Sequence, residues 1–265
     1  MITKAQYDTV SDLIAEVAAA EITPRFRNLQ RGDITEKHPG DLVTVADRRA
    51  EQQLTARLEK LLPGSVTVGE EAVEDDPDLL QALSGDDPVW IIDPVDGTSN
   101  FVAGKTTFAC LVALAHKGHT FASWLNAPAL NLTAGALDGH GAWRNNQPLT
   151  ATPAPDDGPL RICGTHTNYL AGFDLPGKLA KKGVTYTPCS AAGLSYIDLI
   201  DGQYHACVFT WEKPWDHATG LHIHSLVGGA NTTADGQPFR LAGDNALPFV
   251  AAPGGIISTI TALLD

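Results

Sequence analysis

The sequence is poor in basic residues, although it is not poor in charge. Its 18 lysines and arginines stand against 31 aspartates and glutamates over 265 residues, so the formal net charge is −13. A surface this acidic disfavours partners that are themselves polyanions, such as nucleic acids and anionic membranes. It does not exclude a small phosphorylated ligand, because a bound cation can reverse the field within one cleft.

Cysteine and long apolar runs are scarce as well. The four cysteines stand at positions 110, 163, 189 and 207 without the close spacing of a zinc site, so we expect buried thiols in a reducing compartment. No apolar run approaches the roughly 20 residues that span a bilayer, and the first residues lack the pattern of a signal peptide. We therefore expect a cytoplasmic protein that binds neither membrane nor nucleic acid.

The most informative stretch lies at residues 89–101. Residues 89–92 are apolar and predict a buried strand, and Pro94 cannot extend the hydrogen-bond ladder of that strand. Asp93 and Asp96 stand three positions apart, and two neighbouring carboxylates can hold a hard divalent cation. Asp-Pro and Asp-Gly pairs are also common in solvated turns, so the stretch alone leaves both interpretations open.

The next two residues extend this pattern. Gly97 lets the backbone approach a ligand closely, and Thr98 stands where a short helix can begin. Amides at the start of a helix can receive a phosphate oxygen. A cation and a phosphate at one place indicate phosphoryl chemistry.

The nine residues Asp93-Pro-Val-Asp-Gly-Thr-Ser-Asn-Phe101 resemble the signature of the inositol monophosphatase family, which are magnesium-dependent, lithium-sensitive phosphatases. Two further motifs, Gly69-Glu70-Glu71 and Pro214-Trp-Asp-His-Ala-Thr-Gly220, follow the family's order. The similarity extends from about residue 5 to the C-terminus and is weak between about 150 and 188. It implies an α+β / α/β fold, a layered αβαβα sandwich of two halves of the sugar-phosphatase type.

The periodicity of the chain predicts how these halves are built. We expect a helix over residues 4–29 that Pro24 kinks or ends, a polar loop over 31–41 that serves as a lid or a surface connection, and a second helix that Thr44 caps. Hairpin-linked strands follow and complete an N-terminal α+β half, residues 1–151, with most metal ligands. A linker rich in proline, alanine and aspartate at 152–158 then opens a C-terminal α/β half, residues 152–265, which completes the active site.

The resemblance implies two or three Mg²⁺ ions in each active site. The implied ligands are Glu70, Glu71, Asp93, Asp96, Asp216 and the carbonyl of Val95. One ion would use Glu70, Asp93 and Val95, the second Asp93, Asp96 and Asp216, and a third, weaker site Glu70 and Glu71. Together they would clamp the phosphate and the attacking water for an in-line displacement. An alternative for Asp216 is an acid that complements the dipole of a helix beginning at Pro214.

The resemblance also implies catalytic and substrate-binding residues. Thr98 paired with Asp47 would orient the attacking water, with Glu70 as a further catalytic acid. The implied substrate contacts are Asp96, Gly97, Thr98, Ala191 and Asp216. Asp47 also suits a purely structural role at a helix start, and the small residues around Ala191 suit close helix packing. His217 is expected to line the cleft without binding metal.

The resulting hypothesis is a Mg²⁺-dependent phosphomonoesterase that acts on a small polyol or sugar phosphate, with inositol monophosphate as the first candidate. Many family members that act on inositol phosphates carry a glutamate where this chain has Phe209, which leaves the substrate open. Histidinol phosphate, fructose 1,6-bisphosphate and 3′-phosphoadenosine phosphate are the alternatives within the fold. A non-catalytic or regulatory protein that retains the fold and binds a partner is a second class of alternative, and the resemblance implies a homodimer.

Overall fold

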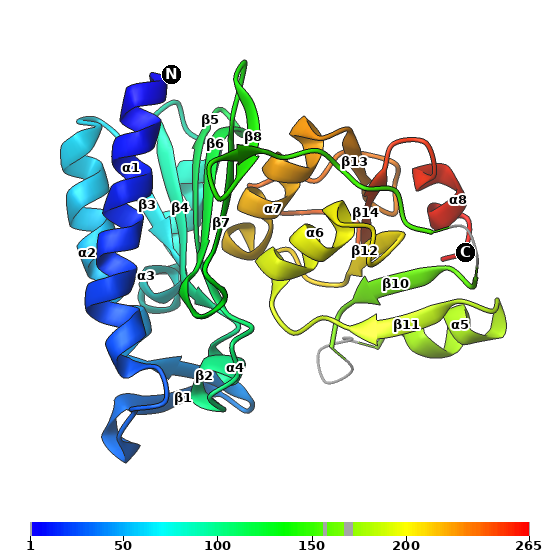
Figure 1. Cartoon of the computed structure of the whole chain (residues 1–265), viewed down its shortest axis with the longest axis horizontal. Helices are drawn as coiled ribbons and strands as arrows, with labels where there is room; N and C mark the ends of the chain where they lie inside the picture. Colours follow the sequence, from blue (N-terminus) through cyan, green and yellow to red (C-terminus); the bar gives the residue numbers. More distant parts are fainter. Residues whose placement is uncertain (1, 156–157, 167–171, 265) are drawn as a thin grey trace.

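The computed structural model describes residues 2–155, 158–166 and 172–264, and these form five alternating layers of helix and sheet (Figure 1). Helices α1, Lys4–Val17, and α2, Val45–Leu61, form one outer layer beside a seven-stranded sheet. Helices α6, Ala192–Ile200, and α7, Pro214–Leu226, lie between this sheet and a five-stranded one. Helices α5, Leu175–Lys181, and α8, Ile257–Thr261, cover the far side. The αβαβα arrangement predicted for the chain is confirmed.

The seven-stranded sheet holds its strands in the order in which they occur in the sequence, from β3 to β9. Its first pair is parallel and every other pair is antiparallel. The strands are β3, Val66–Gly69; β4, Val89–Asp96; β5, Ala109–His116; β6, His119–Ala127; β7, Leu132–Leu137; β8, Gly141–Arg144; and β9, Gln147–Pro148. Short connections join the antiparallel strands from β5 to β9, as the hairpin signals in the sequence predict, whereas residues 97–108 join β4 to β5.

Strand β4 is buried along its whole length. Trp90 and Ile92 contribute to the core under α1 and α2, whereas Val89 and Ile91 contribute to a second core that includes Trp215 of α7. Because both faces are covered by helices, apolar residues occur without alternation, and this explains the continuous apolar run in the sequence.

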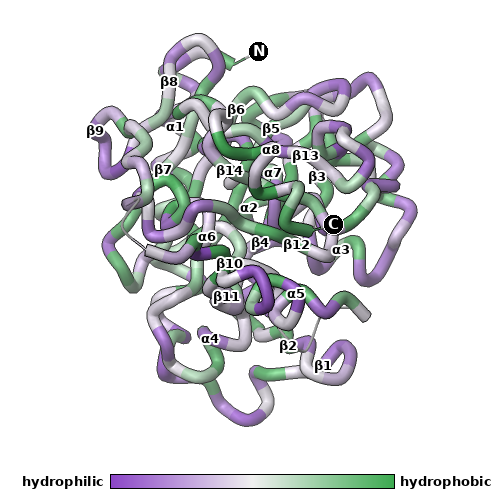
Figure 2. The backbone as a smooth tube through the Cα atoms, turned by 90° about the vertical axis from the view of Figure 1, so that its right-hand side faces the viewer, coloured by the Kyte–Doolittle hydropathy of each residue, from purple (hydrophilic) through white to green (hydrophobic). Residues whose placement is uncertain are grey.

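The five-stranded sheet has the order β11-β10-β12-β14-β13. Strand β10 is parallel to both of its neighbours, and β14 is antiparallel to its own. The strands are β10, Arg161–Gly164; β11, Thr185–Pro188; β12, Ala206–Phe209; β13, Gly229–Thr232; and β14, Phe249–Pro253. Along the tube in Figure 2, hydrophobic stretches run through interior strands such as β12, whereas hydrophilic stretches lie in outer loops such as that near β9.

Three local predictions differ from the structure. The first helix ends earlier than residue 29, because α1 passes into a π-helical turn, Ala18–Ile22, and then a 3-10 turn, Thr23–Arg25, around Pro24. The expected loop at 31–41 contains strand β1, Ile34–His38, which pairs with β2, Asp41–Thr44. Strand β4 does not end before Asp93, because an irregularity in its pairing with β5 accommodates Pro94.

The division into two halves at residue 151 stays a prediction. The first sheet ends at β9, and the chain then crosses to the second sheet, with Thr152 N donating a hydrogen bond to Ile200 O at 2.8 Å. Residues 156 and 157 of the expected linker lie outside the described residues. Helix α7 packs against strands β4 to β7 of the first sheet, so residues from both sides of the proposed boundary share one core. Among the described helices, none has the length and apolar character of a membrane span.

Candidate active site

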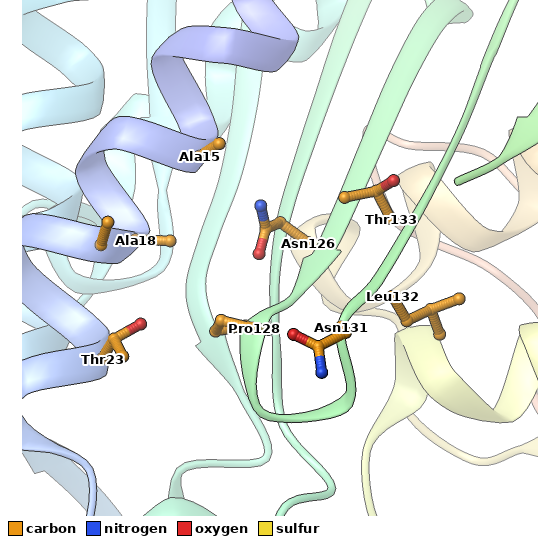
Figure 3. A pocket seen from close by; sticks show the side chains of 9 residues that line it. Ala15, Ala18, Thr23, Asn126, Pro128, Asn131, Leu132 and Thr133 are labelled. Carbon is orange, nitrogen blue, oxygen red and sulfur yellow. The ribbon is translucent and has the colours of Figure 1, made fainter. Parts of the chain in front are cut away.

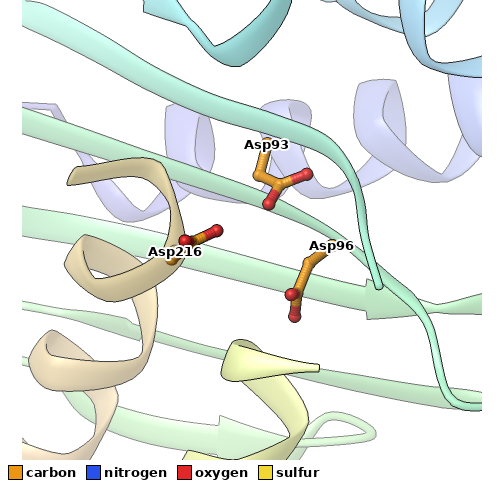
Figure 4. A group of neighbouring side chains, drawn as sticks. All are labelled: Asp93, Asp96 and Asp216. Atoms are coloured by element: carbon orange, nitrogen blue, oxygen red, sulfur yellow. The ribbon is translucent and has the colours of Figure 1, made fainter. Parts of the chain in front are cut away.

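Three aspartates from two distant parts of the chain meet between the first sheet and α7. Asp93 and Asp96 lie on β4, and Asp216 lies in the first turn of α7 (Figure 4). One carboxylate oxygen from each lies within 4.8 Å of the others. Asp93 is 2% exposed and Asp96 is 5% exposed. A group of buried acids this compact has the oxygen donors and the excess negative charge that a hard divalent cation requires.

An irregularity in the pairing of β4 places the side chains of Asp93 and Asp96 on the same face of the sheet. Regular pairing with β5 holds as far as Asp93 opposite Leu111 and resumes at Asp96 opposite Ala109. Three residues of β4 therefore span only two positions of β5. In an even strand, residues three apart point to opposite faces, and the extra residue brings both carboxylates to one face.

Asp96 also links the first sheet to α6. Its Oδ1 accepts a hydrogen bond from Ala192 N at 2.9 Å, and its Oδ2 accepts one from Gly193 N at 2.8 Å. These are the first amides of α6, where an acid complements the helix dipole and satisfies donors that lack an intrahelical partner. The position of α6 is thus tied to that of the acid cluster.

Burial and mutual repulsion make these acids difficult to ionise. Burial raises the pKa of Asp96 to about 7 and that of Asp216 to about 8, and nearby Glu70 adds to both shifts. The pKa of Asp93 is raised by burial, then by Glu70, Asp96 and Asp216. A cation would remove this penalty by favouring the charged forms. These side chains therefore fit a divalent metal.

Glu70 and Glu71 approach the cluster from the start of α3, Glu70–Asp75, directly after β3. Lys37 on β1 bridges them, with its Nζ 2.9 Å from Glu70 Oε1 and 3.1 Å from Glu71 Oε1. The lysine side chain is only 5% exposed. Lys37 lies in the stretch predicted to be a polar loop, and its contact with the acids is not predictable from residue spacing because the pairing of β1 with β2 creates it.

Glu51 is a second residue that sequence analysis did not single out. Its carboxylate accepts hydrogen bonds from Glu71 N at 2.9 Å and Ala72 N at 2.8 Å, and so caps α3. Burial raises the pKa of Glu51 to about 7. A signal was available, because Asp47 and Glu51 stand four residues apart on the same buried face of α2 as Leu54.

Asp47 and Thr98 lie together although 51 positions separate them. Thr98 Oγ1 is 3.2 Å from Asp47 Oδ1 and 3.0 Å from Val95 O, so its single proton is shared between two acceptors. Thr44 holds the other oxygen of Asp47 through its amide, at 2.9 Å, and its hydroxyl, and the predicted cap of α2 by Thr44 is confirmed. Burial raises the pKa of Asp47 to about 6. The proposed roles of Asp47 and Thr98 stay predictions.

Gly97 has a left-handed backbone conformation and lies in a place too narrow for a side chain. Its φ is +86°, in the left-handed region, and it precedes the short helix α4, Thr98–Val102. A Cβ there would lie 2.9 Å from Thr107 O and 3.1 Å from Ala191 Cβ. Ala191 is itself buried, and it is the N-cap residue directly before α6. The substrate contacts expected for Gly97 and Ala191 remain untested, and the structure brings these two residues together.

The surroundings of Asp216 bear on substrate choice. Trp211 Nε1 donates a hydrogen bond to Asp216 Oδ2. Phe209 is fully buried, and Glu212 is engaged by Asn245, with Glu212 Oε2 2.8 Å from both Asn245 N and Nδ2. The expectation that His217 lines the cleft is wrong, because the ring is fully buried and lies 3.1 Å from both Tyr196 Oη and Trp211 O.

A surface hollow beside α1 lies on the other face of the seven-stranded sheet (Figure 3). It is lined by Ala15, Ala18, Ala19, Thr23, Asn126, Pro128, Asn131, Leu132 and Thr133. Asn126 pairs with Cys110, which faces the core under α1. Asp93 pairs with Leu111, which faces α6 and α7. The hollow is therefore separated from the acids by the sheet and is not part of this site.

Comparison with known proteins agrees with this geometry. The model of the inositol monophosphatase family matches residues 3–262, nearly the whole chain. The chain belongs to the inositol monophosphatase family. It is thus a member of a phosphatase family, and its three acidic motifs lie within the matched region.

Curated relatives of this family member carry different functional names. Inositol-1-monophosphatase of Bacillus subtilis is 30% identical over 210 residues, covering 77% of each chain. Fructose-1,6-bisphosphatase/inositol-1-monophosphatase of Thermotoga maritima is 30% identical over 214 residues, covering 78% of each. The Nus factor SuhB of Pseudomonas aeruginosa is 31% identical over 221 residues, covering 77% of this chain and 78% of the relative.

Solved structures of family members share the fold. The 2′-AMP-bound structure of SaIMPase-II is 25% identical, with a TM-score of 0.78 over 98% of this chain and 93% of that chain. Staphylococcal inositol monophosphatase-1, soaked in LiCl, is 22% identical and has a TM-score of 0.84 over 100% of this chain and 96% of that chain. The latter likeness concerns the fold alone.

Proposed function

We propose that this chain is a Mg²⁺-dependent phosphomonoesterase that hydrolyses a small polyol or sugar phosphate, with inositol monophosphate as the first substrate to test. The observation that carries the proposal is the convergence of Asp93, Asp96 and Asp216 within 4.8 Å. Neighbouring buried carboxylates repel one another, and a bound cation offsets this repulsion. The names of the Bacillus and Thermotoga relatives support the substrate class.

The proposed metal ligands are Asp93, Asp96 and Asp216, with Glu70, Glu71 and the carbonyl of Val95 completing the set. Bound Mg²⁺ would supply Lewis-acid polarisation of the phosphate and lower the pKa of water. Lys37 now neutralises Glu70 and Glu71, whose carboxylates would otherwise repel each other. Trp211 fixes one oxygen of Asp216 by a hydrogen bond, and the carboxylate of Asp216 lies beside those of Asp93 and Asp96.

Asp47 and Thr98 are proposed to orient and deprotonate the attacking water. Because Thr98 Oγ1 donates its proton toward Asp47 and Val95, its lone pairs can accept a hydrogen bond from water. The proton lost by water could pass through Thr98 to Asp47, whose pKa of about 6 lies near neutral pH. We propose that Asp96, Gly97, Thr98, Ala191 and Asp216 border the phosphate.

Phosphate release from a panel of phosphomonoesters tests this function. The panel contains inositol 1-phosphate, fructose 1,6-bisphosphate, histidinol phosphate, 3′-phosphoadenosine phosphate and 2′-AMP, each with Mg²⁺ or EDTA. We expect Mg²⁺-dependent release that Asp96→Asn lowers at least 100-fold, because a proposed ligand of the cation loses its negative charge. The matched control is Asp87→Asn, at an exposed aspartate of the loop before β4.

Two outcomes decide the proposal. Mg²⁺-dependent release in the wild type and in Asp87→Asn, but not in Asp96→Asn, supports it, and the preferred substrate identifies the subfamily. Absence of release from every compound by a folded, Mg²⁺-loaded protein contradicts it.

A regulatory role is the second candidate, favoured by the similarity to the Nus factor SuhB. The acid cluster argues for catalysis, since a protein that only binds a partner has no need for converging carboxylates. The panel separates the two, because a regulatory protein would turn over none of the compounds. The homodimer expected from the family and the cytoplasmic location stay predictions.

A further inference from the structure

Three of the four cysteines lie together beneath the turn that carries α6 to the acid cluster. Cys163 on β10 and Cys207 on β12 are register partners on neighbouring parallel strands. Cys189 follows β11, and its amide donates a hydrogen bond to Gly164 O at 2.6 Å. Buried thiols were predicted from the sequence, but their clustering was not, because it depends on the pairing of strands that are distant in the sequence.

Ser195 in α6 is the common partner of this thiol cluster, which consists of Cys163, Cys189 and Cys207. Its Oγ lies 3.1 Å from Cys189 Sγ and 3.5 Å from Cys163 Sγ, and its carbonyl lies 3.5 Å from Cys207 Sγ. The thiols of Cys189 and Cys207 hydrogen-bond to Cys163, and these contacts lower the pKa of Cys163 to about 4. The cluster therefore stabilises one thiolate, which is the nucleophilic form of cysteine.

The three cysteines of the cluster differ in their exposure. Cys163 is 2% exposed and Cys207 is fully buried, whereas Cys189 is partly exposed. A small oxidant can therefore meet Cys189 first. We propose that a hydroperoxide oxidises this cluster to a Cys163–Cys189 disulfide, and that the disulfide switches the active site off.

Each oxidation step balances. Cys189 passes its proton along its hydrogen bond to the Cys163 thiolate as its sulfur attacks one peroxide oxygen. The S–O bond forms, the O–O bond breaks, and the departing oxygen leaves as water or alcohol after taking a proton from solvent. Cys163 then attacks the resulting sulfenic sulfur, forming the S–S bond and breaking the S–O bond, and the proton that Cys163 accepted leaves with the hydroxide as water. In sum, two thiols and one hydroperoxide give one disulfide, one water and one alcohol or second water.

Closing this bond must move the backbone. Cys163 pairs with Thr187, so Cys189 is displaced from it by two positions along β11. Diagonal neighbours of this kind have Cα atoms roughly 7–8 Å apart, whereas a disulfide spans about 4.4–6.8 Å. Strand β11 forms the edge of its sheet and has a partner on one side only, so it is the element that can shift.

The shift reaches the acid cluster through a short chain of contacts. Ser195 Oγ donates a hydrogen bond to Ala191 O at 2.9 Å, and Asn100 Nδ2 donates one to Ser190 O at 2.8 Å. The next amides, of Ala192 and Gly193, hold Asp96. Pulling Cys189 toward β10 therefore displaces the turn that fixes a proposed metal ligand, and phosphatase activity falls. This last step rests on the proposed function.

The test treats the full, Mg²⁺-loaded protein with hydrogen peroxide and then with dithiothreitol. We expect the number of titratable thiols in denaturant to fall from four to two, peptide mapping to find Cys163 joined to Cys189, and activity to fall at least tenfold and return on reduction. Cys189→Ser should keep both its activity and its other thiols under peroxide. Cys110→Ser, at a buried cysteine in the core under α1, should respond as the wild type does.

Three results would overturn the proposal: four thiols surviving treatment, a different linkage such as Cys163–Cys207, or a Cys163–Cys189 disulfide that leaves activity unchanged. If Cys189→Ser folds poorly, Cys163→Ala serves instead, because it removes the other half of the same linkage. The thiol count and the peptide map do not depend on turnover. A protein that forms the disulfide but releases no phosphate before oxidation would count against the proposed function and not against the thiol chemistry.

Discussion

Single residues at the acid cluster combine deep burial with negative charge. Asp96 and Asp216 have pKa values of about 7 and about 8 in the absence of a cation, so both are partly protonated at pH 7. Cation binding should favour their ionised forms and release the protons. The cluster thus links metal binding to pH.

We predict that adding Mg²⁺ to the EDTA-treated, dialysed protein at pH 7 releases about one to two protons per chain. The release should decrease as the pH rises above the pKa values of Asp96 and Asp216, because these two acids are then already ionised, and it should decrease in Asp96→Asn. Calorimetric titration in two buffers of different ionisation enthalpy measures it. Equal apparent heats in the two buffers at pH 7 would contradict the raised pKa values.

Lys37 is the cation that the chain itself supplies to this site. In Lys37→Gln the carboxylates of Glu70 and Glu71 lose their charged partner, so we predict a loss of unfolding free energy of about 2–3 kcal/mol in EDTA. Mg²⁺ should restore part of this loss, because it neutralises the same acids. Urea unfolding with and without Mg²⁺ measures the difference. The control is Lys117→Gln, which removes an exposed ion pair with Asp86.

At the scale of elements, the site depends on how each helix begins. Thr44 caps α2 and orients Asp47, Glu51 caps α3, and Asp96 caps α6. Caps of this kind place an acid or a hydroxyl at a helix start for local reasons. Here the same capping side chains lie beside the proposed catalytic residues, so helix stability and activity are coupled.

We predict that Thr44→Ala lowers the free energy of unfolding by about 1 kcal/mol through the lost cap. It should also lower kcat at least tenfold, because Asp47 loses a hydrogen bond that fixes its carboxylate. Thr44→Ser keeps the hydroxyl and should restore both properties. Chemical unfolding and steady-state kinetics compare the variants, and a fall in stability with unchanged kcat would show that Thr44 has only a structural role.

Sequence motifs predicted some elements well for physical reasons. The apolar run before Asp93 predicted a buried strand, and Thr44 with Asp47 predicted a helix start, because each signal is local. The contact of Lys37 with the acids and the thiol cluster were not predicted, because both depend on strand pairing between separate segments. Glu51 could have been predicted as a buried acid, because it stands on the apolar face of the second predicted helix.

The whole molecule responds to pH through groups far from the acids. His224 on α7 is 3% exposed and packs so closely on Gly229 that a Cβ there would lie 2.2 Å from its ring. Burial lowers the pKa of His224 to about 4. The pKa of a histidine in the unfolded chain is about 6.5. Between pH 6.5 and 4, the unfolded chain therefore binds a proton at His224 that the folded chain does not bind. Stability is therefore retained above about pH 6.5 and is lost as the pH falls toward 4.

We predict that His224 accounts for a loss of about 2 kcal/mol in unfolding free energy between pH 8 and pH 5. The variant His224→Leu should lack this part of the pH dependence, whatever its absolute stability. Urea unfolding at both pH values, compared as a difference from the wild type, isolates the effect from that of the acids. His140→Gln, at an exposed histidine, should keep the wild-type slope, and identical slopes in all three proteins would refute the assignment.

The position of α7 between the two sheets has a consequence for the chain as it is made. Strands β4 to β8 are complete by residue 144, yet the apolar face that α6 and α7 cover stays open until residue 226 has left the ribosome. At roughly 5–20 residues per second, those 226 − 144 = 82 residues take about 4–16 seconds. The nascent chain thus exposes the uncovered apolar face of the first sheet to the cytosol for several seconds. It should be a substrate for ribosome-associated chaperones during that interval.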